Sequence, residues 1–203
     1  MEQFDIKVHE LEFKYKADHV KLAKFQEFAE EAKPKKILYV GSYDTYYSPV
    51  DKASPFISKG LEFVRYRQGT SPELTIKIKL NENNNNSRIE IDLPLSKKVT
   101  KYIVEKFLSW FGFKENFEVF KECYIYFYDK IDIVYYIVRD KEEGKQLACF
   151  IEIEARKDAK FDSADEAWQL VKEMEQKMNI FNISAANRMK RSMWEIFKKD
   201  LWN

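Results

Sequence analysis

The chain has 203 residues, and 45% of them are hydrophobic, which is enough for one large domain with a sizeable core, or for two small ones, and excludes a disordered chain. Its 35 Lys and Arg nearly balance its 34 Asp and Glu, so no overall charge is expected to attract nucleic acid or a membrane. The chain begins without an apolar signal segment and contains no apolar run of about 18 residues. We therefore expect a cytoplasmic protein with no membrane partner.

Cysteine and histidine are scarce, which narrows the chemistry available. Cys123 and Cys149 are single and widely spaced, so a disulfide framework, a CxxC redox site and a thiolate zinc cluster are excluded. His9 and His19 are the only histidines, which leaves little material for a histidine-based metal site or a Cys-His nucleophile pair. Any metal ion must therefore be held by carboxylates.

The first half of the chain is predicted to consist of strands around one helix. A strand at 9–16 precedes an amphipathic helix at 17–33, which Pro34 ends. The next strand, at 36–40, leads into GSYDTYYSP, which we predict to be a loop. The strands after it are expected at residues 63–69, 74–80 and 88–93. The asparagine-rich segment at 81–87 is predicted to be a polar hairpin tip.

The second half begins with a predicted helix at 96–113. Ser96 is its expected N-cap, and Ile103, Phe107 and Trp110 form its expected apolar side. Three further strands are expected at residues 120–128, 132–140 and 148–155. A third and a fourth amphipathic helix are expected at residues 163–178 and 185–201.

Five of the predicted strands carry charged residues at alternate positions, with apolar residues between them. Because strand side chains alternate between the two faces of a sheet, these charges share one face. The bases on this face are Lys14, Arg65, Arg67, Lys77, Lys79 and Arg88. The acids on it are Glu10, Glu12, Glu90, Asp92, Glu152 and Glu154.

An antiparallel sheet with one solvated face would produce such alternation without any function. However, the positions are almost purely charged, and the signs are clustered by strand. We therefore predict an α+β fold, a closed antiparallel eight-stranded barrel with a charged interior and helices outside, spanning residues 1–203 as one domain. The enclosed charges must pair with one another, with water or with a ligand. Clustered bases suit phosphate oxygens, and clustered carboxylates suit Mg²⁺ or Mn²⁺.

Several segments, in this order, resemble the CYTH superfamily of triphosphate tunnel metalloenzymes. These segments are ELEFK at 10–14, YDTYY at 43–47, VRYR at 64–67, LTIK at 74–77, RIEID at 88–92, Asp140, FIEIE at 150–154 and RSMW at 191–194. The superfamily includes class IV adenylyl cyclases, thiamine triphosphatases and inorganic triphosphatases. The likeness covers nearly the whole chain.

The resemblance implies a role for each charged residue. Glu10, Glu12, Glu152 and Glu154 would hold Mg²⁺ or Mn²⁺, with Glu90 and Asp92 nearby. Arg65, Arg67, Lys77, Lys79 and Arg88 would bind phosphates. Lys14, Lys121 and Asp140 would take part in catalysis. The chain has Lys121-Glu122-Cys123 where the family often has Lys-x-Arg, so one phosphate-binding cation is replaced.

Three functions are consistent with these residues. The first is metal-assisted hydrolysis of tripolyphosphate, a nucleoside triphosphate or thiamine triphosphate. The second is cyclisation of ATP to cyclic AMP and pyrophosphate, and the third is binding of a nucleotide or polyphosphate without turnover. The expected partner is a small triphosphate; nucleic acid is expected only as an RNA 5′-triphosphate, and the protein as a monomer or homodimer.

Overall fold

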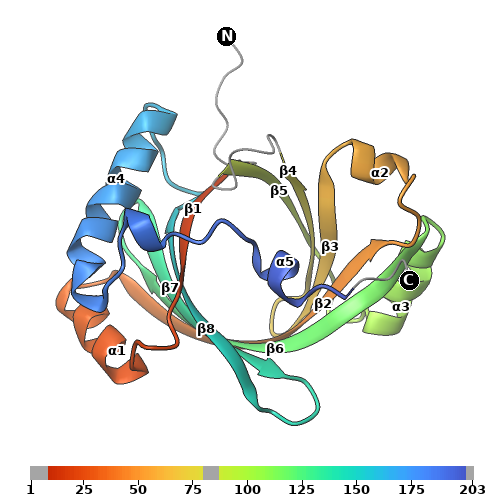
Figure 1. Cartoon of the computed structure of the whole chain (residues 1–203), viewed down its shortest axis with the longest axis horizontal. Helices are drawn as coiled ribbons and strands as arrows, with labels where there is room; N and C mark the ends of the chain where they lie inside the picture. Colours follow the sequence, from red (N-terminus) through yellow and green to blue (C-terminus); the bar gives the residue numbers. More distant parts are fainter. Residues whose placement is uncertain (1–8, 80–86, 200–203) are drawn as a thin grey trace. The chain divides into compact units, whose positions relative to one another are not determined.

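The computed structural model describes residues 9–79 and 87–199 (Figure 1). Its strands are β1 His9–Lys16, β2 Lys36–Pro49, β3 Leu61–Gln68, β4 Glu73–Lys79, β5 Ser87–Pro94, β6 Phe113–Phe127, β7 Ile131–Asp140 and β8 Gln146–Ala155. Its helices are α1 Leu22–Glu31, α2 Pro55–Ser58, α3 Lys101–Ser109, α4 Ala164–Lys177 and α5 Met193–Phe197, with the 3-10 helices η1 Met178–Phe181 and η2 Ala185–Asn187. Within the described residues, no helix has both the length and the apolarity needed to cross a membrane.

The chain forms two compact units, each assembled from separate segments. The first unit comprises Met1–Val40, Glu122–Val138 and Gln146–Lys190. The second comprises Gly41–Lys121, Arg139–Lys145 and Arg191–Asn203. Three strands (β2, β6 and β7) contribute residues to both units.

The predicted α+β class and the eight antiparallel strands are confirmed. In the first unit the strands follow the order β1-β8-β7-β6, and in the second the order β5-β4-β3-β2-β6. Closure of the eight strands into one barrel stays a prediction, because the ladder of β1 with β8 and the ladder of β2 to β5 lie in different units.

In the first unit, β1 pairs with β8 so that Glu12 lies opposite Glu154, and Lys14 opposite Glu152. Alternation sends Leu11, Phe13 and Tyr15 to the other face, where they join a core formed with α1, β7, β8 and α4. The Phe13 ring stacks on Trp168 of α4 at 5.1 Å between centroids. The helices thus cover the apolar face of these strands and leave the charged face on the other side.

Glu175 of α4 holds three parts of the first unit together. It accepts hydrogen bonds from the hydroxyl of Tyr15 in β1 and from both Nε and Nη2 of Arg188. The Arg188 guanidinium also lies 3.6 Å from the centre of the Phe13 ring. One residue further, the Met189 amide donates to the Lys14 carbonyl at 2.8 Å, so this segment is bound along β1.

Glu175→Ala is expected to destabilise the protein by about 2–4 kcal/mol, because Arg188 and the buried Tyr15 hydroxyl lose their shared acceptor. Urea unfolding measures the change, and limited proteolysis reports loosening near Arg188. Glu173→Ala on the exposed side of the same helix is the control and should change stability by less than about 0.5 kcal/mol. Equal stability of the two variants would contradict the prediction.

In the second unit, β2, β3, β4 and β5 form a continuous antiparallel ladder. Its register places Asp44 opposite Arg67, Arg65 opposite Thr75, Thr75 opposite Asp92 and Lys77 opposite Glu90. On the other face, apolar residues of β2, β3 and β4 pack with α3 and with Phe113. These apolar residues lie on the face opposite the charged residues, whereas Phe63, opposite Lys77 in the ladder, shares the charged face.

Residues 41–49 are strand, which corrects the predicted loop. Gly41 and the polar residues after it are typical of a turn, but β2 continues to Pro49. A Cβ at Gly41 would approach the Phe120 ring to 3.0 Å, so glycine here permits a close approach of β6. Beyond it, Tyr46 and Tyr47 are both buried.

The helix predicted at 96–113 is shorter and turned differently. It spans Lys101–Ser109, and Thr100 rather than Ser96 is its N-cap. Val104 and Leu108 face the core, whereas Ile103, Phe107 and Trp110, the predicted apolar side, are exposed. The prediction failed because the helix has apolar residues on both sides, so periodicity alone did not identify the buried one.

The other helices also differ from prediction. The first is confined to Leu22–Glu31, while the third matches the prediction closely, with Ser163 accepting from the Glu166 amide. The single helix predicted at 185–201 is replaced by η2 and α5, and Ser192 begins α5 with a capping box. The intervening segment bonds to β1 instead of continuing a helix. The predicted hairpin tip, apart from Ser87, lies outside the described residues.

Candidate functional site

Four bases and four acids gather on the charged face of the second unit. The bases are Arg65, Arg67, Lys77 and Lys121, and the acids are Asp44, Glu73, Glu90 and Asp92. Strand alternation and the register between β2 and β5 place them there. Equal numbers of each sign make the cluster neutral, which is how so many charges can share a largely buried face.

Arg67 and Asp44 form the centre of the cluster. Arg67 Nε and Nη2 each donate to one oxygen of Asp44 at 2.9 Å. This bidentate contact fixes the orientation of the guanidinium plane relative to the carboxylate plane. Arg67 Nη1 donates to Glu73 at 3.1 Å. Lys121 Nζ lies 4.0 Å from the second Asp44 oxygen. Asp44, with no exposed surface, thus lies among cations from two other strands.

Arg65 joins the acids of β4 and β5. Its Nη2 donates to Thr75 Oγ1 at 2.7 Å and to Glu73 at 3.1 Å. The Thr75 hydroxyl in turn donates to Asp92 at 2.8 Å. Arg65 Nε is buried and has no hydrogen-bond acceptor within the described residues. Arg65 therefore keeps a buried donor that a further acceptor can use.

Lys77 extends the cluster along β4. Its Nζ lies 2.9 Å from Glu90, the residue opposite it in the ladder. Beside these charges, burial and the neighbouring Asp44 raise the pKa of the Tyr46 phenol, which therefore stays neutral. The face combines fixed cations, paired carboxylates and one neutral phenol.

The pKa of Asp44 is governed by its cations. Burial alone would raise it, but the charges of Arg67, Arg65 and Lys121 outweigh burial and hold the Asp44 pKa well below its ordinary value of 3.8. The ionised carboxylate therefore stabilises the fold above about pH 4, and this contribution is lost as pH falls from there toward the lower, folded pKa.

Asp44→Asn is expected to cost about 3–5 kcal/mol at neutral pH, because Arg67 is left without its buried charge partner. The difference in unfolding free energy between wild type and variant should stay constant above about pH 5 and shrink as pH falls below 4. Urea unfolding at a series of pH values measures it. A difference that widens on acidification would contradict the predicted pKa direction.

The first unit carries a second charged group on β1 and β8. Lys14 Nζ lies 2.8 Å from Glu152 and 3.3 Å from Glu12. The hydroxyl of Tyr136 in β7 donates to the same Glu152 oxygen at 2.9 Å. Glu154 lies opposite Glu12 in the ladder. This cluster therefore has more acids than bases, and Lys14 neutralises only part of its negative charge.

These carboxylates offer oxygen donors of the kind that Mg²⁺ and Mn²⁺ prefer. Within the described residues, no three Asp, Glu, His or Cys side chains gather as a complete metal site. Mg²⁺, however, is usually bound by one or two carboxylates together with substrate phosphates. Glu12 and Glu154, held opposite each other, fit that mode of binding.

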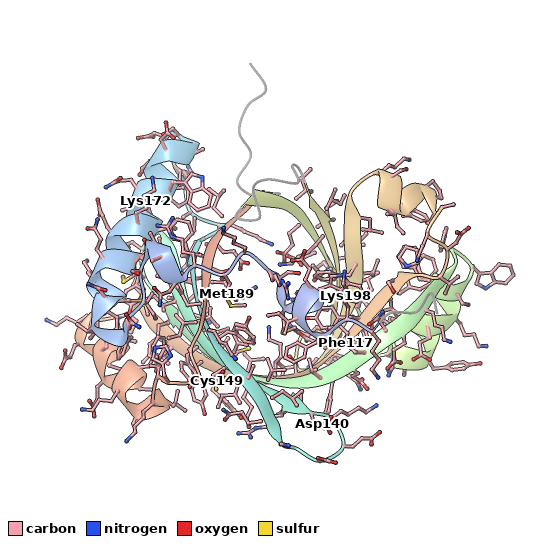
Figure 2. The ribbon with its side chains drawn as sticks, in the orientation of Figure 1. Phe117, Asp140, Cys149, Lys172, Met189 and Lys198 are labelled. Atoms are coloured by element: carbon pink, nitrogen blue, oxygen red, sulfur yellow. The ribbon has the colours of Figure 1, made fainter. Side chains whose placement is uncertain are left out.

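The remaining predicted site residues either lie away from these two charged clusters or have side chains that the structure does not describe. Lys79 and Arg88 are opposite each other at the end of the β4–β5 ladder, and their side chains, like that of Glu10, are not among those described. Asp140 lies at the β7–β8 hairpin (Figure 2). Its carboxylate accepts the amides of Glu142 and Glu143, both at 2.8 Å, which lowers its pKa. This geometry gives Asp140 a turn-forming role.

Sequence reasoning missed Asp44, Glu73 and Thr75 as members of the cluster. Asp44 lies within YDTYY, and a loop at 41–49 gives no reason to expect that it alternates with Ser42 and Tyr46 along a strand. Reading that segment as a strand would have placed Asp44 on a defined face. Glu73 and Thr75 carried a signal in their alternation with Lys77.

The chain matches one family model over nearly its whole length. This model, described as the CYTH domain, matches residues 8–193. A search of curated proteins found no match. Solved structures share the fold, and three of them are described here. One, from Pyrococcus horikoshii OT3, is 25% identical, with a TM-score of 0.64 and coverage of 92% of this chain and 97% of that one.

The second, described as a proposed adenylate cyclase from Vibrio parahaemolyticus, is 16% identical, with a TM-score of 0.63 and coverage of 93% and 97%. The third, from Hippeastrum, is 10% identical, with a TM-score of 0.61 and coverage of 94% of both chains, and is reported with a dominant triphosphatase activity. The family match extends over nearly all of the chain and includes both charged groups. The chain belongs to the CYTH domain family.

Proposed function

We propose that the protein hydrolyses a small triphosphate compound in a reaction that requires Mg²⁺ or Mn²⁺. The observation that carries this proposal is the buried face of the second unit, where Arg65, Arg67, Lys77 and Lys121 lie together. Guanidinium forks and ammonium groups recognise phosphate oxygens, and a triphosphate carries roughly four negative charges at neutral pH.

In the proposed complex, phosphate oxygens replace the carboxylate of Glu73 as the shared partner of the two arginines. Arg65 Nε is already buried without an acceptor, and Arg67 shares Glu73 with Arg65. Asp44 keeps Arg67 in place from the other side. Lys77 and Lys121 add positive charge, but an ammonium group does not have the planar donor geometry of a guanidinium. Preorganised donors of this kind stabilise charge that develops during phosphoryl transfer.

The carboxylates of β1 and β8 have the metal-binding role in this proposal. Glu12 and Glu154 would hold the ion, and Glu152 and Glu10 would contribute oxygens near it. When bound, the metal ion supplies charge neutralisation and a lowered pKa for an attacking water. Lys14 offsets the repulsion between Glu12 and Glu152 and holds both side chains in place.

Hydrolysis is ranked before cyclisation because it needs only bound phosphates and a water. A cyclase must also bind the nucleobase and align a ribose hydroxyl with the α-phosphate. The Vibrio relative's description favours the cyclase, and the reported activity of the Hippeastrum protein favours hydrolysis. Sequestration without turnover and action on an RNA 5′-triphosphate are the remaining alternatives.

The test is a panel of tripolyphosphate, ATP and thiamine triphosphate, each with Mg²⁺, Mn²⁺ or a chelator, with every product identified. We expect metal-dependent release of orthophosphate, which stops with chelator and returns with added metal. Cyclic AMP with pyrophosphate would replace hydrolysis by cyclisation. Tight binding without product under every condition would identify a sequestering protein, and undiminished turnover in chelator would refute the metal-binding role.

A further inference from the structure

The outer side of α3 in the second unit carries an unusually large exposed apolar surface. Trp110, just after the helix, is 87% exposed, and Tyr102, Phe107, Phe111 and Ile103 are each at least half exposed. The rings of Phe107 and Phe111 contact each other at 5.1 Å between centroids. We call these five residues the α3 patch. Isolated exposed apolar residues are ordinary, but a contiguous group of this size marks an interaction site.

The patch is not needed to attach α3 to the protein. Val104 and Leu108, on the opposite side of the helix, are buried in the core of the second unit. Lys101 also anchors the helix through Glu115 at 2.7 Å and Glu118 at 3.1 Å. A helix that is apolar on both sides is normally covered on both. The α3 patch therefore calls for a partner beyond the described residues.

The charged residues near the patch indicate the sign of the charge that its partner carries. Lys97 and Lys98 precede the helix in sequence and Lys114 follows the patch, and all three are exposed, while Lys106 lies over the Tyr102 ring at 5.5 Å. In the part of the chain that the structure describes, none of these four lysines forms an ion pair with a carboxylate. In a twofold-symmetric dimer the same patch meets itself, so lysines would face lysines. The partner is therefore expected to be anionic.

We propose that the α3 patch binds an anionic lipid surface. Trp, Tyr and Phe with flanking lysines form the composition of interfacial helices, whose rings enter the boundary between headgroups and acyl chains while the lysines contact anionic headgroups. The exposed rings project from the outer side of a helix, a form that suits a deformable surface. The net charge of the whole chain, +1, gives no sign of this local group of lysines, because it is a sum over all residues.

Vesicle sedimentation of the full chain tests the proposal. We expect binding to vesicles of 70% phosphatidylcholine and 30% phosphatidylserine, weak binding to pure phosphatidylcholine, and loss of binding at high salt. Phe107→Ser with Trp110→Ser should weaken binding more than tenfold. Lys97→Gln with Lys98→Gln should weaken it by roughly 25-fold, about fivefold for each lysine. In the wild type, tryptophan fluorescence should shift to shorter wavelength with anionic vesicles, and in Trp110→Phe it should not.

Ile180→Ser, which removes an exposed apolar residue of the first unit, and Lys160→Gln are the matched controls and should bind as wild type does. Triphosphate turnover and unfolding free energy should be unchanged in all variants, since none alters the charged faces. Vesicle binding that is absent in wild type, or that survives the Phe107/Trp110 change, would overturn the proposal. So would dimerisation, or binding of single-stranded RNA, that depends on the patch while vesicle binding does not.

Discussion

Arg65→Met is expected to weaken tripolyphosphate binding by at least about a hundredfold. The guanidinium already donates two bonds within the cluster and holds a third, buried donor in reserve. Two charge-assisted hydrogen bonds to phosphate contribute together at least about 3 kcal/mol, and methionine keeps much of the side-chain volume without any donor. Isothermal titration calorimetry measures the change directly.

The variant also leaves Glu73 and Glu90 with less positive charge around them, so its stability must be measured in parallel. The double variant Arg65→Met with Glu90→Gln restores charge balance and should recover stability without recovering binding. Arg65→Lys keeps the charge but loses the planar fork, and it should bind with intermediate affinity. Lys59→Met, an exposed cation in the same unit, is the control. Wild-type affinity in a folded Arg65→Met protein would remove this face from the proposed site.

Glu12→Gln and Glu154→Gln are each expected to lower metal-dependent turnover by about a hundredfold or more. Each change replaces a charged oxygen ligand with a neutral amide of nearly the same shape, and Lewis-acid stabilisation by a bound metal is worth several kcal/mol. Tripolyphosphate affinity without metal should change much less, because these carboxylates do not donate to phosphates. Steady-state kinetics over a range of Mg²⁺ and Mn²⁺ concentrations measure the loss, which should be partly offset at high metal concentration.

Glu27→Gln on the exposed side of α1 serves as the control and should leave turnover unchanged. Because Lys14 bridges Glu12 and Glu152, the Glu12→Gln variant should remain folded with its lysine still paired. Wild-type rates in both glutamine variants would refute the assigned metal ligands. Loss of binding together with loss of turnover would point to phosphate positioning as the role of Glu12 and Glu154.

Strand positions and the faces of their side chains were largely predictable. In β1, β3, β4, β5 and β8 the charged and apolar residues alternate, and the two-residue period of a strand fixes which of them share a face. Where a strand contained turn-like residues the prediction failed, as at Gly41, because the packing of Phe120 over that glycine comes from a strand distant in sequence. For α3, two apolar sides competed, and the core contact of Val104 and Leu108 decided between them.

The sequence by itself determined that bases and acids of this protein lie on the sheet face opposite the apolar core, since that follows from local alternation along each strand. Which acid neutralises which base was decided only by the tertiary structure. Register between strands places Asp44 beside Arg67 and Glu90 beside Lys77, and a shift by one residue would reverse the faces. Asp140 shows the same limit, because its charge was visible in the sequence, while its amide partners in the hairpin turn depend on how the chain folds back.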